Sequence, residues 1–204
     1  MHFTCAICGA EHDIDEISFG TDAPVQWGLL SDDERSRSLL AGEQCEIESR
    51  EGRSFYIRAC LEIPIRGTGR TFTWGVWCSL SEKSYVEIAE HWDDPARLSL
   101  GPHFGWLCTK IPGYPDTVFL KTMVHQRDVG VRPLVELEAT DHLLAVDQRN
   151  GIEEGRMRDI VIGLLHEGGQ QDAAPNSRPP SQSSSSPKVQ TPDSQRTSSS
   201  GGCG

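Results

Sequence analysis

The fold is decided by two stretches of alternating sequence, SFYIRACLEI at residues 54–63 and TFTWGVWCSL at residues 71–80. Every second residue in each stretch is apolar, which is the pattern of a β-strand with one face in the core. The segment 66–70 between them contains two glycines and predicts a tight connection, so we expect an antiparallel hairpin. The side chains predicted on its buried face are Phe55, Ile57, Ala59, Leu61, Ile63, Phe72, Trp74, Val76, Cys78 and Leu80.

Two tryptophans of the second stretch indicate how the sheet is covered. Trp77 lies an odd number of positions from Trp74, so the two indoles face opposite sides of the sheet. We expect both sides to be covered, one by helices and the other by loops, because two large apolar rings are then shielded from water. The alternative is that one of the two caps a surface groove.

Outside this hairpin, several segments have the composition of strands. They lie at residues 43–49, 104–108, 117–126 and 129–138, and the last two predict a second hairpin. The expected fold class is therefore α+β: an antiparallel sheet of hairpins with about three helices, an N-terminal CxxC knuckle and a disordered C-terminal tail.

The three helices follow from caps and spacing. Ser31 and Glu34 have the S-x-x-E pattern of a capping box, which predicts a helix that continues to about Leu40. Apolar residues at three- and four-residue spacing predict a second helix over 81–92 and a third over about 151–165.

Composition divides the 204-residue chain near residue 166. All 14 aromatic residues lie before residue 120, and residues 167–204 contain 10 serines and 5 prolines. Such a segment buries too little apolar surface to offset the entropy of ordering. We therefore expect one globular α+β domain at 1–166 and a disordered Ser/Pro-rich tail at 167–204.

Charge and hydropathy narrow the classes of partner. The net charge of −11 falls entirely on residues 1–166, because the tail carries three acidic and three basic residues. An acidic surface repels phosphate backbones, so we expect no nucleic-acid partner. The longest apolar run, residues 160–165, is far shorter than the roughly 20 residues that cross a bilayer, so we expect no membrane association. The absence of a recognisable secretory signal favours a cytoplasmic location, where thiols stay reduced.

The sharpest chemical signal is Cys5-x-x-Cys8-Gly9, with His12 four residues after Cys8. A two-residue gap lets both thiolates point at one ion, and Gly9 permits the tight turn, so Cys5, Cys8 and His12 are predicted zinc ligands. Tetrahedral zinc needs a fourth ligand, and the sequence contains no second CxxC motif. A redox pair and two simply packed cysteines are the alternatives. The candidates for the fourth position are Cys45, Cys60, Cys78 and His125.

Polar residues on the predicted strands form a second group of interest. His125 and His142 are candidates for a general base if a carboxylate lies nearby. No nucleophile with a fixed partner spacing accompanies them, so we assign no catalytic residue. The simpler interpretation is a solvated sheet face lined by paired charges.

Several blocks of the sequence, taken together, resemble a known family. These blocks are, in order, Phe3-x-Cys5-x-x-Cys8-Gly9, Leu61-Glu62-Ile63-Pro64, Trp74-Gly75-Val76-Trp77, Phe104-Gly105-Trp106-Leu107, Pro112-Gly113-Tyr114-Pro115 and Arg132-Pro133-Leu134-Val135-Glu136-Leu137-Glu138. They resemble a bacterial family catalogued only as a domain of unknown function, number 2199, over roughly residues 1–165. The resemblance implies a small soluble bacterial protein and implies no activity. The Ser/Pro-rich tail departs from this pattern and looks like an extension peculiar to this chain.

Three functions are compatible with these observations. We expect a non-enzymatic binding or adaptor domain with a protein partner, because the sequence has a metal-knuckle motif and no catalytic signature. A metal- or His-dependent hydrolase with a site near His125 and His142 is one alternative. An acidic, immunity-type antagonist of a basic protein is the other, since acidic surfaces steer towards basic partners.

Overall fold

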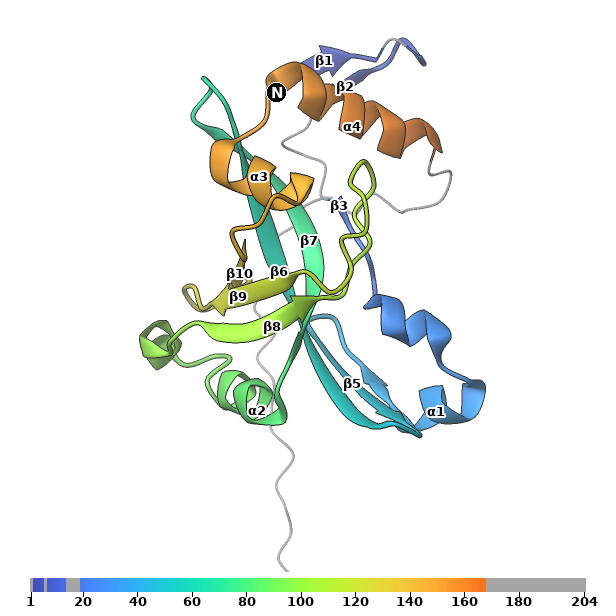
Figure 1. Ribbon diagram of the computed structural model, residues 1–204, viewed down its shortest axis with the longest axis vertical. Coiled ribbons are helices and arrows are strands. Elements are labelled where there is room, and N and C mark those ends of the chain that lie inside the picture. The colour runs from blue at the N-terminus through green and yellow to red at the C-terminus, as the bar shows by residue number, and fades with distance from the viewer. Residues whose placement is uncertain (1, 6, 14–18, 168–204) are drawn as a thin grey trace, which may run out of the picture.

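The computed structural model describes residues 2–5, 7–13 and 19–167, which form a mixed fold of helices and strands (Figure 1). Of the predicted disordered tail, residues 168–204 lie outside the described residues, and Glu167 is the last residue of the final helix. The strands are His2–Thr4 (β1), Glu11–Asp13 (β2), Phe19–Gly20 (β3), Leu39–Leu40 (β4), Gln44–Ser49 (β5), Gly52–Ile65 (β6), Arg70–Leu80 (β7), His103–Leu107 (β8), Lys121–His125 (β9) and Leu134–Leu137 (β10). The α-helices are Asp32–Arg37 (α1), Glu82–Glu90 (α2), Leu143–Asn150 (α3) and Glu154–Glu167 (α4). Two 3₁₀ helices span Val25–Leu29 and Pro95–Ser99.

The central sheet closes into a small barrel of β6, β7, β8, β9 and β10. The pairs β6–β7, β7–β8, β8–β9 and β9–β10 are antiparallel, and β10 pairs with β6 in parallel to close the ring. The prediction of an antiparallel sheet of hairpins is therefore wrong in its topology. Strand β6 is long enough to pair with β5 over its first half and with β10 at Cys60 and Leu61. Alternating hydrophobicity specifies which face of β6 is buried, and it carries no information on this change of partner.

The β6–β7 hairpin and its buried face are confirmed. All ten side chains predicted on this face are buried, and they form the main core with residues of α2, α3 and α4. The opposite face is covered as well: Trp77 is fully buried in a smaller core with Cys45, Ile47, Tyr56 and Cys108. Its indole N–H donates to the Thr21 carbonyl at 2.9 Å. Both tryptophan-bearing sides are therefore shielded, as expected.

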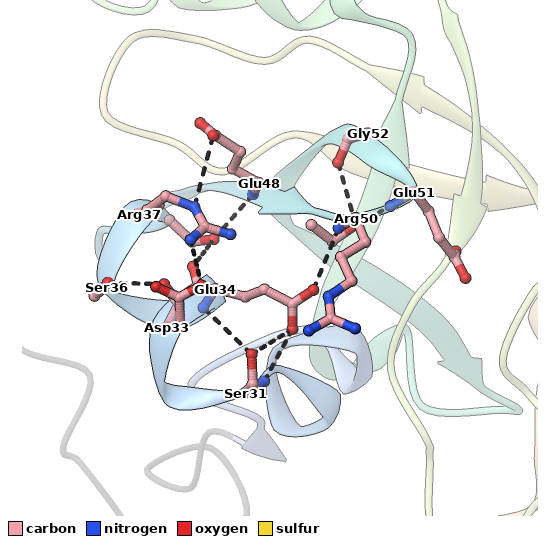
Figure 2. Close-up of polar contacts among 11 residues, drawn as sticks. Ser31, Asp33, Glu34, Ser36, Arg37, Glu48, Arg50, Glu51 and Gly52 are labelled. Atoms are coloured by element: carbon pink, nitrogen blue, oxygen red, sulfur yellow. Dashed lines mark hydrogen bonds and ion pairs between the residues drawn. The ribbon is translucent and has the colours of Figure 1, made fainter.

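The capping box at the start of α1 is confirmed (Figure 2). The Ser31 hydroxyl accepts the Glu34 N–H at 3.4 Å, and a Glu34 carboxylate oxygen accepts the Ser31 N–H at 3.1 Å. The helix ends earlier than predicted, at Arg37, and Leu39–Leu40 forms β4 instead. The reason is Ser38, whose hydroxyl donates to the Glu34 carbonyl and accepts the Glu48 N–H, so the chain turns towards β5.

The helices that follow were predicted in part. The second predicted helix corresponds to α2, which begins after the N-cap Ser81. The third corresponds to α4, while α3 was missed because its eight residues are too few for a clear periodicity. Among the described helices, none has both the length and the apolar composition that a membrane crossing requires.

Candidate metal centre

A short hairpin of β1 and β2 positions the predicted ligands. The Cys5 N–H donates to the Ala10 carbonyl at 2.8 Å, and the Gly9 N–H donates to the Cys5 carbonyl at 2.9 Å. Gly9 has a φ of +70°, a left-handed conformation that glycine adopts without steric cost. The turn folds the chain back so that His12, on β2, lies near Cys8.

The three predicted ligands come together at this turn. One ligand atom from each of Cys5, Cys8 and His12 lies within 4.8 Å of the other two. The Cys8 sulfur is 3.5 Å from His12 Nε2. Zinc bond lengths of about 2.3 Å to sulfur and 2.0–2.1 Å to nitrogen place two tetrahedral ligands about 3.6 Å apart. The distance between Cys8 and His12 therefore fits a zinc-sized ion with little adjustment.

The environment of Cys5 favours its thiolate. Hydrogen bonds lower the pKa of Cys5 to about 7: the largest contribution comes from the backbone N–H of Cys8, and the Ile7 N–H, 3.4 Å from the sulfur, is another. Burial of this residue opposes the shift. Since the thiolate is the form that binds metal, the turn prepares Cys5 to act as a ligand near neutral pH.

One residue missed by sequence analysis contacts this cluster. His166, in the last turn of α4, places Nε2 3.0 Å from the Cys5 sulfur. In Figure 1, α4 lies beside the β1–β2 hairpin at one end of the molecule. No sequence signal links two residues 161 positions apart, because local spacing patterns act only within one element.

The structure places the four sequence-derived candidates for a fourth ligand elsewhere. Among the described residues, none of them joins the group formed by Cys5, Cys8 and His12. Cys45 is buried in the smaller core, where burial raises its thiol pKa to about 12. Burial also raises the pKa of Cys60, on β6, and of Cys78, on β7.

The two candidate catalytic histidines have separate contacts. His125 Nε2, at the exposed end of β9, lies 3.1 Å from a Glu136 carboxylate oxygen on β10. His142 caps α3: its Nδ1 accepts the Leu144 N–H at 3.2 Å, and its Nε2 lies 2.6 Å from the Pro115 carbonyl. Both ring nitrogens of His142 thus contact backbone groups.

Other charged residues in the strands or next to them pair with one another. Lys121 lies 3.2 Å from Glu138, Arg132 makes a two-pronged contact with Glu43 at 2.7 and 2.8 Å, and Arg127 pairs with Glu62. The charges are therefore paired, as the simpler interpretation supposed, although most of them lie beside the strands rather than on one sheet face.

Comparison with known proteins identifies a family. The family DUF2199, described as an uncharacterized protein conserved in bacteria, matches residues 4–152. The matched segment includes the CxxC turn and the whole barrel and ends before α4. No curated protein and no solved structure matches the chain.

Proposed function

The chain belongs to DUF2199, a family of uncharacterised bacterial proteins, and we propose that it is a non-enzymatic, cytoplasmic protein-binding domain whose N-terminal hairpin is ordered by a structural zinc ion. The observation that carries the zinc assignment is the convergence of Cys5, Cys8 and His12 at one turn. Thiolate and imidazole ligands at this spacing suit zinc better than the hard cations, which prefer oxygen.

A structural rather than catalytic role is supported by the surroundings of the cluster. Catalytic zinc keeps a position open to water or substrate, whereas structural zinc is enclosed by protein ligands. Cys5 is 1% exposed and packs into the main core, so one side of the site is protein. Two hollows in the described part of the protein are lined by other elements, one around Phe55 and Phe119 and one around Phe104 and Glu136.

An exposed aromatic surface supports the binding role. Phe104 and Trp106 on β8 are 49% and 37% exposed, and their rings pack edge to face with centroids 5.3 Å apart. A hollow of about 270 Å³ adjoins Phe104 and is bordered by Met123 on β9 and Glu138. Protein interfaces are enriched in aromatic side chains, and the net charge of −11 favours a partner with basic groups.

The metal content of the full chain tests the proposal. Protein purified without a metal-affinity tag should contain about one zinc per chain by elemental analysis, the content of a single four-ligand site. Cys8→Ser should remove the zinc and increase amide exchange in residues 2–12. The β6–β7 hairpin should keep its protection, because its packed core does not depend on the ion. The matched control is Cys45→Ser, which changes a buried thiol outside the cluster. Zinc content near zero in freshly purified wild-type protein would contradict the assignment.

Cobalt substitution separates a structural from a catalytic ion. Cobalt in a closed tetrahedral site should give an absorption spectrum that does not change when cyanide or azide is added, because no coordination position is open. A change in the spectrum on adding these anions would favour the metal-dependent hydrolase instead.

A further inference from the structure

We infer that His166 is the fourth zinc ligand, so that the ion joins the N-terminal hairpin to the last turn of α4. This inference rests on the proposed zinc site at Cys5, Cys8 and His12. With His166 as a ligand, the site is no longer confined to one hairpin. It forms a clasp, that is, a metal link between the β1–β2 hairpin and α4.

The direct contact between Cys5 and His166 is the first argument. His166 Nε2 lies 3.0 Å from the Cys5 sulfur, and tetrahedral zinc would place these two atoms about 3.6 Å apart. Cys5 is held in the core, whereas His166 is exposed. His166 is not among the residues whose ligand atoms all lie within 4.8 Å of one another, so its imidazole must move towards Cys8 and His12 to join them. Because the side chain is exposed, it can do so without repacking the core.

The ligand count is the second argument. Cys5, Cys8 and His12 provide three ligands, and a structural zinc site is almost always four-coordinate. Within the part of the chain that the structure describes, His166 is the further histidine that contacts this group. The complete set is two thiolates and two imidazoles, one of the common structural zinc combinations.

The packing of α4 is the third argument, because it shows what such a clasp would hold. The first half of the helix is anchored by buried Met157 and by Arg156, which lies 3.0 Å from the buried carboxylate of Asp147. Beyond Val161, the apolar residues of the helix are only partly buried, including Leu165 next to His166. The last turn therefore depends less on core packing, and a metal bond at His166 would fix it against the hairpin.

The test compares zinc binding by the wild type, His166→Ala and the control His125→Ala. All three carry Cys203→Ser, so that the tail thiol does not contribute to the measured binding. Zinc affinity is measured by competition with a chromophoric chelator. Because even loss of an indirect partner of a ligand weakens metal binding about 10–100-fold, His166→Ala should weaken it at least about 10-fold. His125→Ala should bind zinc as the wild type does.

Amide exchange with and without zinc locates the effect. In the wild type, zinc should slow exchange both in residues 2–12 and in the second half of α4. In His166→Ala, added zinc should still slow exchange in residues 2–12 and should have no effect on α4. His166→Gln, which keeps a polar side chain of similar length, should behave like the alanine variant. Near-ultraviolet circular dichroism verifies that each variant is folded.

Two different results would overturn the inference, and they can be told apart. If His166→Ala binds zinc with wild-type affinity and zinc protects α4 equally in both proteins, His166 is not a ligand, while the hairpin site stands. If the wild type binds no zinc at all, both the clasp and the proposed site fail.

Discussion

Replacing Gly105 by alanine tests the close pairing of β7 and β8 within the barrel. Gly105 lies in the middle of β8, opposite Leu80 of β7 and Thr122 of β9. A Cβ added at this position would lie 2.3 Å from the backbone carbonyl oxygen of Ser79, on β7, and 3.3 Å from the Thr122 hydroxyl. The obstruction is therefore backbone that is itself part of the sheet.

The size of the effect follows from this distance. Real Cβ atoms essentially never come closer than 3.0 Å to such an atom, so a gap of 2.3 Å requires β7 and β8 to separate by about 0.7 Å. Because β8 pairs with strands on both sides, neither neighbour can move away freely. Overpacking of a core costs about 1–3 kcal/mol, and we expect Gly105→Ala to lie near the upper end, at about 3 kcal/mol.

Urea unfolding, monitored by tryptophan fluorescence, measures this loss in the free energy of unfolding. For a domain of this size, about 3 kcal/mol corresponds to a fall in melting temperature of about 6–12 °C. Gly101→Ala is the matched control, because no atom lies within 4 Å of a Cβ added there and the residue precedes the same strand. A Gly105→Ala variant as stable as the Gly101→Ala control would refute the close approach of β7 and β8.

Three further predictions concern caps and buried polar groups. Ser31→Ala should lower the free energy of unfolding by about 1 kcal/mol in urea titration, because an N–H at the start of α1 loses its acceptor. Hydrogen bonds from the Ser31 side chain and backbone lower the pKa of Glu34 below its ordinary 4.5. The ionised carboxylate therefore stabilises the fold above pH 4.5, and this stabilisation is lost as the pH falls through the lowered pKa of Glu34. The stability difference between wild type and Glu34→Gln should accordingly shrink between neutral pH and about pH 3, and a constant difference would contradict the assignment. Asp147→Ala should cost about 2 kcal/mol in thermal or urea unfolding, because the buried Tyr114 hydroxyl, 3.0 Å away, and Arg156 lose their common partner, and an unchanged midpoint would show that this network contributes nothing.

One part of the metal centre can be predicted from the sequence, and the other part cannot. Cys5, Cys8 and His12 lie within eight consecutive residues, so their spacing alone predicts that one turn can bring them together. His166 reaches the cluster only because α4 packs on the main core through Met157 and Val161 and ends beside the hairpin. Among the seven cysteines and seven histidines, the sequence offered no physical reason to prefer His166 over Cys45 or His125.

The sequence by itself determined the features that depend on neighbouring residues. Alternation in 54–63 and 71–80 specified the buried face of the hairpin, and Ser31 with Glu34 specified the start of α1. These signals are readable because side-chain direction and cap hydrogen bonds are set by backbone geometry over two to four residues.

Only the tertiary structure decided which elements meet. The parallel pairing of β10 with β6 turns a series of hairpins into a barrel, and the position of α4 brings His166 to Cys5. A strand exposes the same backbone donors and acceptors to any neighbour, so its own sequence does not determine which strand it pairs with. The choice is made by the packing of the whole core, to which residues far apart along the chain contribute together.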